Sequence, residues 1–386
     1  MSLQTLLFTA LGIVACHTSE PSDDTDADTD TDADTDTDTD TDGDTDTNDW
    51  LFQVIEEGGC LRDVDTTPAT SIAVDGGNAV HVVYSGRLRY AVEQGGEWLI
   101  EDKGTIDGSS VFTTTPKLRI DEEGIPHVGF ASGGTGYYAP VYATRSAEAV
   151  WSVETLGDAS SIAVGPAASL ALDGDGTPHM SYVDRGGGVF LAIREADTWS
   201  YVQVDAWPGS LAIELDDAGV THLAMVGTRV SYATNASGSW EQEQVDAESE
   251  STRYLAGLAV SPDGGTVHLL YLNKNELVYA TNADGPWRTA PVAVDAMVLT
   301  YEEGGFSGGG IALGPSGTLH VTYVDDANAL RHGWATQDSW QTETVLASGA
   351  AQGTASLAID GGGGVHLAYC TKDTDTLALA QLIAQD

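Results

Sequence analysis

The chain has 386 residues, with 59 acidic against 15 basic side chains, and its formal net charge is −44. This charge argues against binding to nucleic acid phosphates, which needs a basic surface that releases counterions. The 45 glycines and the short runs rich in Val, Ile, Thr, Tyr and Trp favour an all-β protein with many turns.

The first sixteen residues, MSLQTLLFTALGIVAC, form an apolar segment that ends at Cys16 and is too short to span a membrane comfortably. Residues 1–16 resemble a bacterial lipoprotein signal peptide, in which a small residue precedes a cysteine that is lipidated. No Lys or Arg precedes the apolar run, and a plain signal peptide with an incidental cysteine is the alternative. The resemblance implies an exported protein with a lipid anchor in the bacterial envelope, on its surface or periplasmic side.

Residues 17–49 are dominated by alternating Asp and Thr, and residues 20–49 contain 14 Asp, one Glu and no Lys or Arg. Because like charges at every second residue repel and nothing apolar can be buried, we expect a disordered acidic linker. It resembles the Asp-Thr linkers of surface lipoproteins in some Gram-negative soil bacteria. Weak, non-specific calcium binding is the one cofactor role expected here, since the terminal bidentate Glu of an EF-hand is missing.

The remaining residues, 50–386, contain seven copies of one pattern. Seven histidines stand 46, 52, 43, 46, 52 and 46 residues apart: His81, His127, His179, His222, His268, His320 and His366. An Asp precedes the histidine by six residues in five copies, and a Gly precedes it by three in six copies. A metal ion would suit Asp173, Asp175 and His179 in the third copy. Sevenfold repetition instead predicts structural histidines and turn-capping aspartates, with no metal site.

Each copy divides into four short strands, and the fourth starts at a tryptophan in six copies. Four antiparallel strands repeated every 40 to 50 residues or so are typical of a β-propeller blade. The last copy ends without its tryptophan strand, while an orphan strand that starts at Trp50 precedes the first copy. We therefore predict one seven-bladed β-propeller over residues 50–386, an all-β fold closed by pairing of the N-terminal strand into the last blade.

The full pattern is S-L-A-hydrophobic-D-x-x-G-x-x-H-x-x-Y, followed by L-x-Y-A and a tryptophan strand. It resembles the repeats of bacterial propellers in the broad sialidase-like and lectin-like group. The resemblance implies the fold but carries no activity. Sialidases of that group use three arginines, a tyrosine nucleophile and boxes of the form S-x-D-x-G-x-T-W, and no copy here has that box.

Two cysteines lie where the predicted ring closes. In a propeller, the connection from strand four to the next strand one opens on the same face as the loop between strands two and three. Cys60 belongs to the first kind of loop and Cys370 to the second, both beside the seventh blade. In an exported protein this placement favours a disulfide that holds the closure together.

Departures from the repeat supply the candidate binding residues. Six copies have an alanine on the first, innermost strand: Ala73, Ala171, Ala212, Ala259, Ala312 and Ala358. Arg119 takes that place in the second copy, so we expect it near the axis, either paired with an acidic neighbour or in contact with a ligand. The other candidates lie in loops that open on one face: Tyr137, Tyr138, Asp184, Arg185, Trp207, Tyr301, Asp325 and Asp326.

Aromatic and carboxylate side chains on one face suit stacking on sugar rings and hydrogen bonding to hydroxyls, or a protein partner. The leading hypothesis is a monomeric, non-catalytic binding module for a glycan or protein ligand, which meets the membrane through its lipid anchor only. One alternative is a polysaccharide hydrolase or lyase that uses loop carboxylates. A second alternative is a structural component of an envelope complex.

Overall fold

The computed structural model describes residues 50–60, 69–84, 88–103, 116–134, 137–157, 168–184, 186–206, 209–247, 253–296, 298–301, 304–307, 309–336 and 339–383. Residues 48–386 form one compact unit. The expected signal segment with Cys16 and the expected linker, residues 17–49, lie outside the described residues. Every regular element in the described ranges is a β-strand, and no helix there could cross a membrane.

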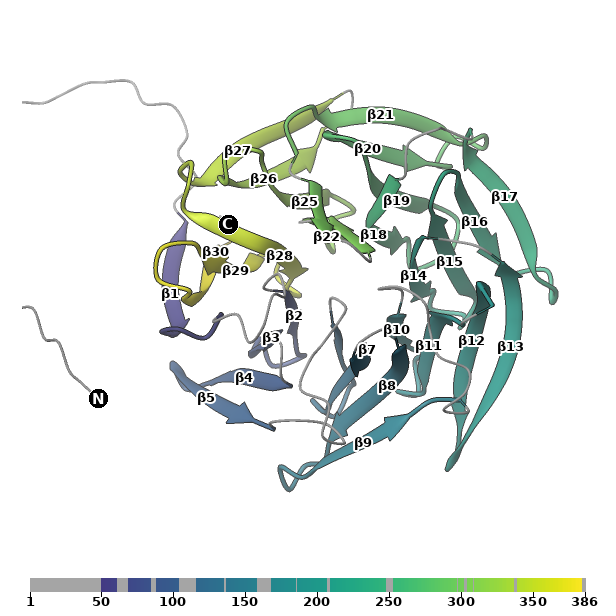
Figure 1. Ribbon diagram of the computed structural model, residues 1–386, viewed down its shortest axis with the longest axis horizontal. Helices are drawn as coiled ribbons and strands as arrows, with labels where there is room; N and C mark the ends of the chain where they lie inside the picture. Colours follow the sequence, from purple (N-terminus) through teal and green to yellow (C-terminus); the bar gives the residue numbers. More distant parts are fainter. Residues whose placement is uncertain are drawn as a thin grey trace, which may run out of the picture. The chain divides into compact units, whose positions relative to one another are not determined.

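The strands form seven four-stranded antiparallel blades in a ring (Figure 1), which confirms the predicted seven-bladed β-propeller. Blade one comprises β2 (Thr70–Val74), β3 (Val80–Tyr84), β4 (Arg89–Gln94) and β5 (Glu97–Asp102). Blade two comprises β6 (Lys117–Ile120), β7 (Pro126–Gly134), β8 (Tyr137–Arg145) and β9 (Trp151–Thr155). Blade three comprises β10 (Ala168–Leu172), β11 (Pro178–Val183), β12 (Gly188–Glu195) and β13 (Thr198–Ala206). Blade four comprises β14 (Ser210–Leu215), β15 (Thr221–Val226), β16 (Val230–Thr234) and β17 (Glu241–Asp246). Blade five comprises β18 (Arg253–Val260), β19 (Val267–Asn273), β20 (Glu276–Thr281) and β21 (Arg288–Ala293).

Blade six comprises β24 (Gly309–Leu313), β25 (Leu319–Val324), β26 (Leu330–Ala335) and β27 (Trp340–Leu346). Blade seven comprises β28 (Ala351–Ile359), β29 (Val365–Thr371) and β30 (Leu377–Leu382), and its fourth strand is β1 (Leu51–Glu56). A hairpin of β22 (Val298–Tyr301) and β23 (Gly304–Ser307) is inserted between blades five and six. The connection after blade five is therefore not a plain loop but carries its own small sheet.

The turn between the first two strands of a blade explains the Asp and Gly of the repeat. In blade two, Oδ1 of Asp121 accepts the backbone amide of Ile125 at 2.7 Å, which holds the turn closed. Gly124 has a φ of +77°, a left-handed conformation that glycine adopts without steric cost. Blade one lacks this glycine, and Asn78 takes the place with a φ of +66°, because Asn tolerates the left-handed region better than most residues.

The hydrophobic core is divided among the interfaces between neighbouring blades. Each of seven clusters of buried apolar side chains draws its members from two adjacent blades. Tyr90 of blade one, for example, belongs to one cluster with Phe130 of blade two. Backbones approach closely, since a methyl group on Gly129 would lie 2.8 Å from Cβ of Leu170 in the next blade. Stability therefore comes from nearest-neighbour contacts around the ring.

The ring is closed by β1, which pairs antiparallel with β30, from Leu51 opposite Gln381. Figure 1 shows the purple β1 beside the yellow β30, so the two ends of the propeller chain share one blade. Cys60, just after β1, forms a disulfide with Cys370 at the end of β29; their Cα atoms are 6.0 Å apart and both residues are fully buried. A covalent bond thus reinforces the strand pairing that completes the ring.

Removing this disulfide is expected to destabilise the propeller, because the bond joins residues 310 positions apart. The entropy of closing so long a loop corresponds to on the order of 5 kcal/mol. Urea unfolding of a Cys60→Ala/Cys370→Ala variant measures the loss. A reductant should lower wild-type stability to that of the variant and leave the variant unchanged. Equal unfolding free energies for oxidised wild type and variant would contradict this expectation.

Candidate functional site

The seven repeat histidines lie on the second strand of each blade and are spread around the ring. In four blades Nδ1 contacts a tyrosine hydroxyl on the third strand at 2.6 Å: His81 with Tyr90, His127 with Tyr142, His222 with Tyr232, and His268 with Tyr279. In five blades Nε2 faces the carboxylate of the repeat aspartate at 2.9 to 3.6 Å. Within the described residues, no three His, Cys, Asp or Glu side chains are grouped as metal ligands.

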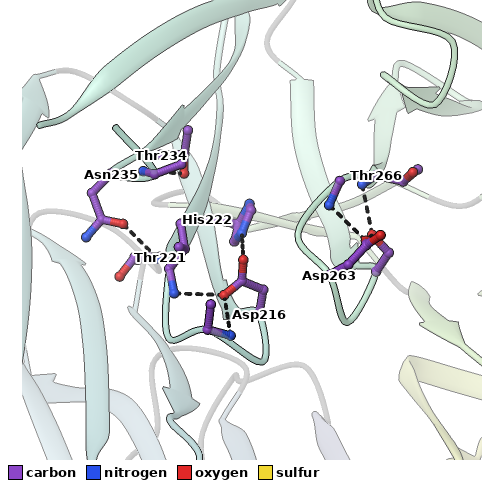
Figure 2. Close-up of polar contacts among 12 residues, drawn as sticks. Asp216, Thr221, His222, Thr234, Asn235, Asp263 and Thr266 are labelled. Carbon is purple, nitrogen blue, oxygen red and sulfur yellow. Dashed lines mark hydrogen bonds and ion pairs between the residues drawn. The ribbon is translucent and has the colours of Figure 1, made fainter. Parts of the chain in front are cut away.

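The repeat aspartate divides its two carboxylate oxygens between the turn and the histidine. In blade four (Figure 2), Oδ1 of Asp216 accepts the backbone amides of Ala218 and Val220 at 3.0 and 2.8 Å, while Oδ2 faces Nε2 of His222. A neighbouring side chain fixes the start of the same strand, because Oδ1 of Asn235 accepts the amide of Thr221. Both oxygens of the aspartate are used in holding the blade together.

The tyrosines extend this chain of contacts to the next blade. Each packs against a tryptophan of the following blade with ring centroids 5.2 to 5.4 Å apart: Tyr90 with Trp151, Tyr142 with Trp199, Tyr232 with Trp287, and Tyr279 with Trp340. Three of these tryptophans donate Nε1–H back to a glutamate of the tyrosine's blade: Trp151 to Glu101, Trp199 to Glu154, and Trp287 to Glu243. In blades one, two and four, Asp, His and Tyr therefore form a connected series with the Trp of the next blade, across the interface between the two blades.

Burial lowers the pKa of six repeat histidines and so favours their neutral form: His81, His127, His179, His222, His268 and His320. Desolvation lowers the pKa of His127 and His222, although the adjacent aspartate opposes the shift. Blades five and six have no aspartate in this position, and there desolvation lowers the pKa of His268 and His320 to about 4. A neutral, buried imidazole held by fixed partners is a hydrogen-bonding link rather than a proton-transfer group.

Two loop-face candidates belong to turns. Asp325 is 1 % exposed, its Oδ1 accepts two backbone amides of its own turn, and its Oδ2 accepts a hydrogen bond from Nε of Arg331 at 2.8 Å. The carboxylate of Asp325 is therefore buried and occupied, which does not favour the expected contact with a ligand. Asp184 caps the β11–β12 turn, where its Oδ1 accepts the amide of Gly188 at 2.6 Å.

Other loop-face candidates lie on the β7–β8 hairpin, on the β22–β23 hairpin, or near them. Tyr137 and Tyr138 begin β8, and Tyr301 ends β22, but their side chains lie outside the described part of the chain. Asp326 is exposed, and its backbone amide donates to the carbonyl of Asp295, which ties the β25–β26 turn to the connection after blade five. Arg185 and Trp207 lie outside the described residues.

A central cavity of about 150 Å³ is lined by the innermost strands of all seven blades. Arg119 lies in it and forms an ion pair with Glu214 on β14 in blade four, so the expected acidic neighbour comes from two blades away. Lys117, two residues before Arg119 on β6, lines the same cavity. Arg119 was expected here from its place in the repeat, whereas Glu214 and Lys117 were not.

The strand register shows that Glu214, and not Ala212, occupies the repeat position of the alanines in blade four. The residue opposite the repeat histidine is Arg119 in blade two and Glu214 in blade four. In the other five blades it is alanine: Ala73, Ala171, Ala259, Ala312 and Ala358. Ala212 lies two positions before Glu214 on β14 and pairs with Ala224 instead. Two blades therefore depart from alanine, with opposite charges.

Comparison with known proteins identifies the fold. No protein-family model and no curated protein sequence matches the chain. The BP39L lectin of Burkholderia pseudomallei has a TM-score of 0.56 at 13% identity, over 86% of this chain and 95% of the lectin. The SapL1 lectin, solved in complex with α-methyl fucoside, has a TM-score of 0.50 at 12% identity, over 75% and 98%. A prolyl endopeptidase structure also reaches 0.50 at 13% identity, over 86% of this chain and 51% of that one. Such low identities show a shared propeller fold alone.

The lowered histidine pKa values predict a loss of stability in mild acid. The unfolded chain binds a proton at each histidine near pH 6.5, whereas folded His268 does so near pH 4. The free energy of unfolding should therefore fall as the pH drops from 6.5 to 4. In a His268→Asn variant, the free energy of unfolding should depend less steeply on pH, by the contribution of about one proton taken up on unfolding. Urea unfolding between pH 7 and 4.5 measures this slope.

Tyr279→Phe is the matched control for this experiment, since it removes the hydroxyl partner but leaves the imidazole of His268 buried. It should lower the free energy of unfolding by about 1 kcal/mol and keep most of the slope. A His268→Asn variant with the wild-type slope would show that this histidine does not contribute to the acid sensitivity.

Proposed function

We propose that the protein is a non-catalytic glycan-binding propeller, whose ligand lies on the loop face. The loop face is formed by the loops between second and third strands and by the connections between blades. The observation that carries the proposal is the concentration of departures from the repeat on this face. In blade one, the β3–β4 hairpin stops pairing three residues after the repeat histidine, at Tyr84 opposite Arg89. In blade two, the β7–β8 hairpin is four residues longer on this side and pairs as far as Gly134 opposite Tyr137.

The second addition on this face is the β22–β23 hairpin, which belongs to the connection from blade five to blade six. The sequence gives both hairpins tyrosines, at 137, 138 and 301. Aromatic rings stack on the apolar faces of sugars, and an exposed carboxylate such as that of Asp326 accepts hydrogen bonds from sugar hydroxyls. The lectin function of the similar BP39L and SapL1 propellers supports a glycan as the ligand class.

Hydrolysis of a polysaccharide is less well supported than binding. It requires an acid and a base carboxylate that both reach the scissile bond. Asp325 is buried against Arg331, and one oxygen of Asp184 is used in a turn. These contacts give both carboxylates a structural role on the loop face, which favours binding over hydrolysis.

A Tyr137→Ala/Tyr138→Ala variant should bind glycan at least tenfold more weakly, or about 1.4 kcal/mol, because stacking is lost. A glycan array identifies the ligand, and calorimetry measures the affinity. Glu122→Ala/Glu123→Ala alters exposed residues at the other end of the same blade and should keep the wild-type affinity. Release of sugar products, or the absence of any array signal from folded protein, would refute the proposal.

We propose further that a lipid on Cys16 holds the propeller at the bacterial envelope, with residues 17–49 as an acidic spacer; the sequence of residues 1–49 is its support. Metabolic labelling with a palmitate analogue should be lost in Cys16→Ala and kept in Cys60→Ala/Cys370→Ala. Equal labelling of wild type and Cys16→Ala would disprove the anchor.

A further inference from the structure

Among the described residues, the lining of the central cavity has one positive charge beyond its ion pair. The described residues of its lining include three charged ones, of which Arg119 and Glu214 pair with each other. Lys117 is the third, and the described residues provide no hydrogen bond or ion pair for its ammonium group. The other lining side chains are small, aliphatic or hydroxyl-bearing. The described lining of this cavity thus has a formal charge of +1, in a protein with a formal net charge of −44.

The strand register places hydroxyl groups at the level of this lysine. Lys117 lies two residues nearer the loop face than Arg119 on β6. Ser71 in blade one and Ser169 in blade three, the two neighbours of blade two, lie at the same level as Lys117 and line the same cavity. Each Oγ accepts a backbone amide of the following blade, at 3.0 and 3.3 Å, so each hydroxyl still has a hydrogen to donate.

The charged groups of the cavity influence the pKa values of Lys117 and Glu214. Burial, together with the nearby Arg119, lowers the pKa of Lys117 to about 8, and Glu214 opposes this shift. Burial also raises the pKa of Glu214, against the effect of the two cations. An uncompensated charge in a confined space is unfavourable until a counterion joins it. A bound anion would remove that penalty.

We propose that this cavity binds a small organic monocarboxylate, whose carboxylate lies against Lys117 and the hydroxyls of Ser71 and Ser169. A single negative charge matches the surplus, whereas a sulfate or phosphate dianion would leave a negative charge unpaired. A volume of about 150 Å³ exceeds what a halide ion needs and has room for roughly six to ten non-hydrogen atoms. Aliphatic lining residues such as Leu258 and Ile311 suit the carbon part of the ligand. This site is independent of the proposed glycan site on the loop face.

Calorimetry on the full chain at pH 7 tests the proposal with lactate as the probe. Lactamide has nearly the same shape but no charge, and it should bind at least tenfold more weakly than lactate. Chloride at equal concentration should not displace lactate. Binding of lactamide or chloride as tight as that of lactate, or no lactate binding by folded protein, would overturn the proposal.

Variants identify the residues involved. Lys117→Met should weaken lactate binding at least tenfold, whereas Lys117→Arg keeps the charge and should stay within threefold of wild type. Glu214→Gln removes the competing negative charge and should tighten binding at least threefold. Lys372→Met, which alters an exposed lysine on a loop at the end of β29, is the control and should leave the affinity unchanged. A Lys117→Met variant that binds lactate like wild type would overturn the assignment.

The pH dependence provides a readout that a purely structural lysine would not give. Lactate affinity should fall as the pH rises through about 8, because Lys117 then loses its proton. Among the described residues, the other charged groups that line the cavity are Arg119 on the same strand and Glu214 on β14. An affinity that stays constant from pH 7 to 9.5 would overturn the role of Lys117.

Discussion

The hydrogen bond between a histidine on the second strand and a tyrosine on the third is the contact around which most blades are organised. A buried imidazole needs partners for both nitrogens, because an unpaired buried polar group costs about 1 to 3 kcal/mol. In blade two, Asp121 satisfies one nitrogen of His127 while it closes the turn, and Tyr142 satisfies the other while its ring packs on Trp199 of the next blade. Turn, blade and interface are therefore fixed together. Since the core lies at these interfaces, the stability of the whole ring depends on this contact.

The blades without the tyrosine show what the contact requires. In blade six, Nε2 of His332 lies 3.0 Å from Nδ1 of His320, and Nδ1 of His332 contacts Glu343 at 2.8 Å. In blade seven, Gln381 reaches Nδ1 of His366 at 3.1 Å. In blade three, Leu191 stands in the tyrosine position, and the described residues offer Nδ1 of His179 no partner. A polar partner is thus kept in six blades, although its chemistry changes.

The fold could be predicted from the sequence because each repeated residue has a task that recurs at a fixed distance. The cavity and loop residues could not be predicted equally well, since their roles depend on register and on backbone geometry. Alignment by residue type matched Ala212 to the alanines of other blades, whereas register follows the distance from the histidine and puts Glu214 there. The residue opposite the histidine lies eight positions before it in every blade except blade five, whose turn is one residue longer. Counting by this distance would have placed Glu214 there. Asp325 resembled a free carboxylate because capping of a turn is not visible in composition.

Sevenfold repetition also limits what the axis can contain. A charged residue opposite the histidine in every blade would bring seven like charges into one narrow cavity, where a low dielectric strengthens their repulsion. Alanine in five blades avoids this, so a charge at that position has to be specific to one blade and balanced by another, as Arg119 is by Glu214. Lys117 is not balanced in this way by any described residue. Residues that break the repeat at the axis or on the loop face can take up a ligand without disturbing the Asp, His, Tyr and Trp contacts that hold the blades together.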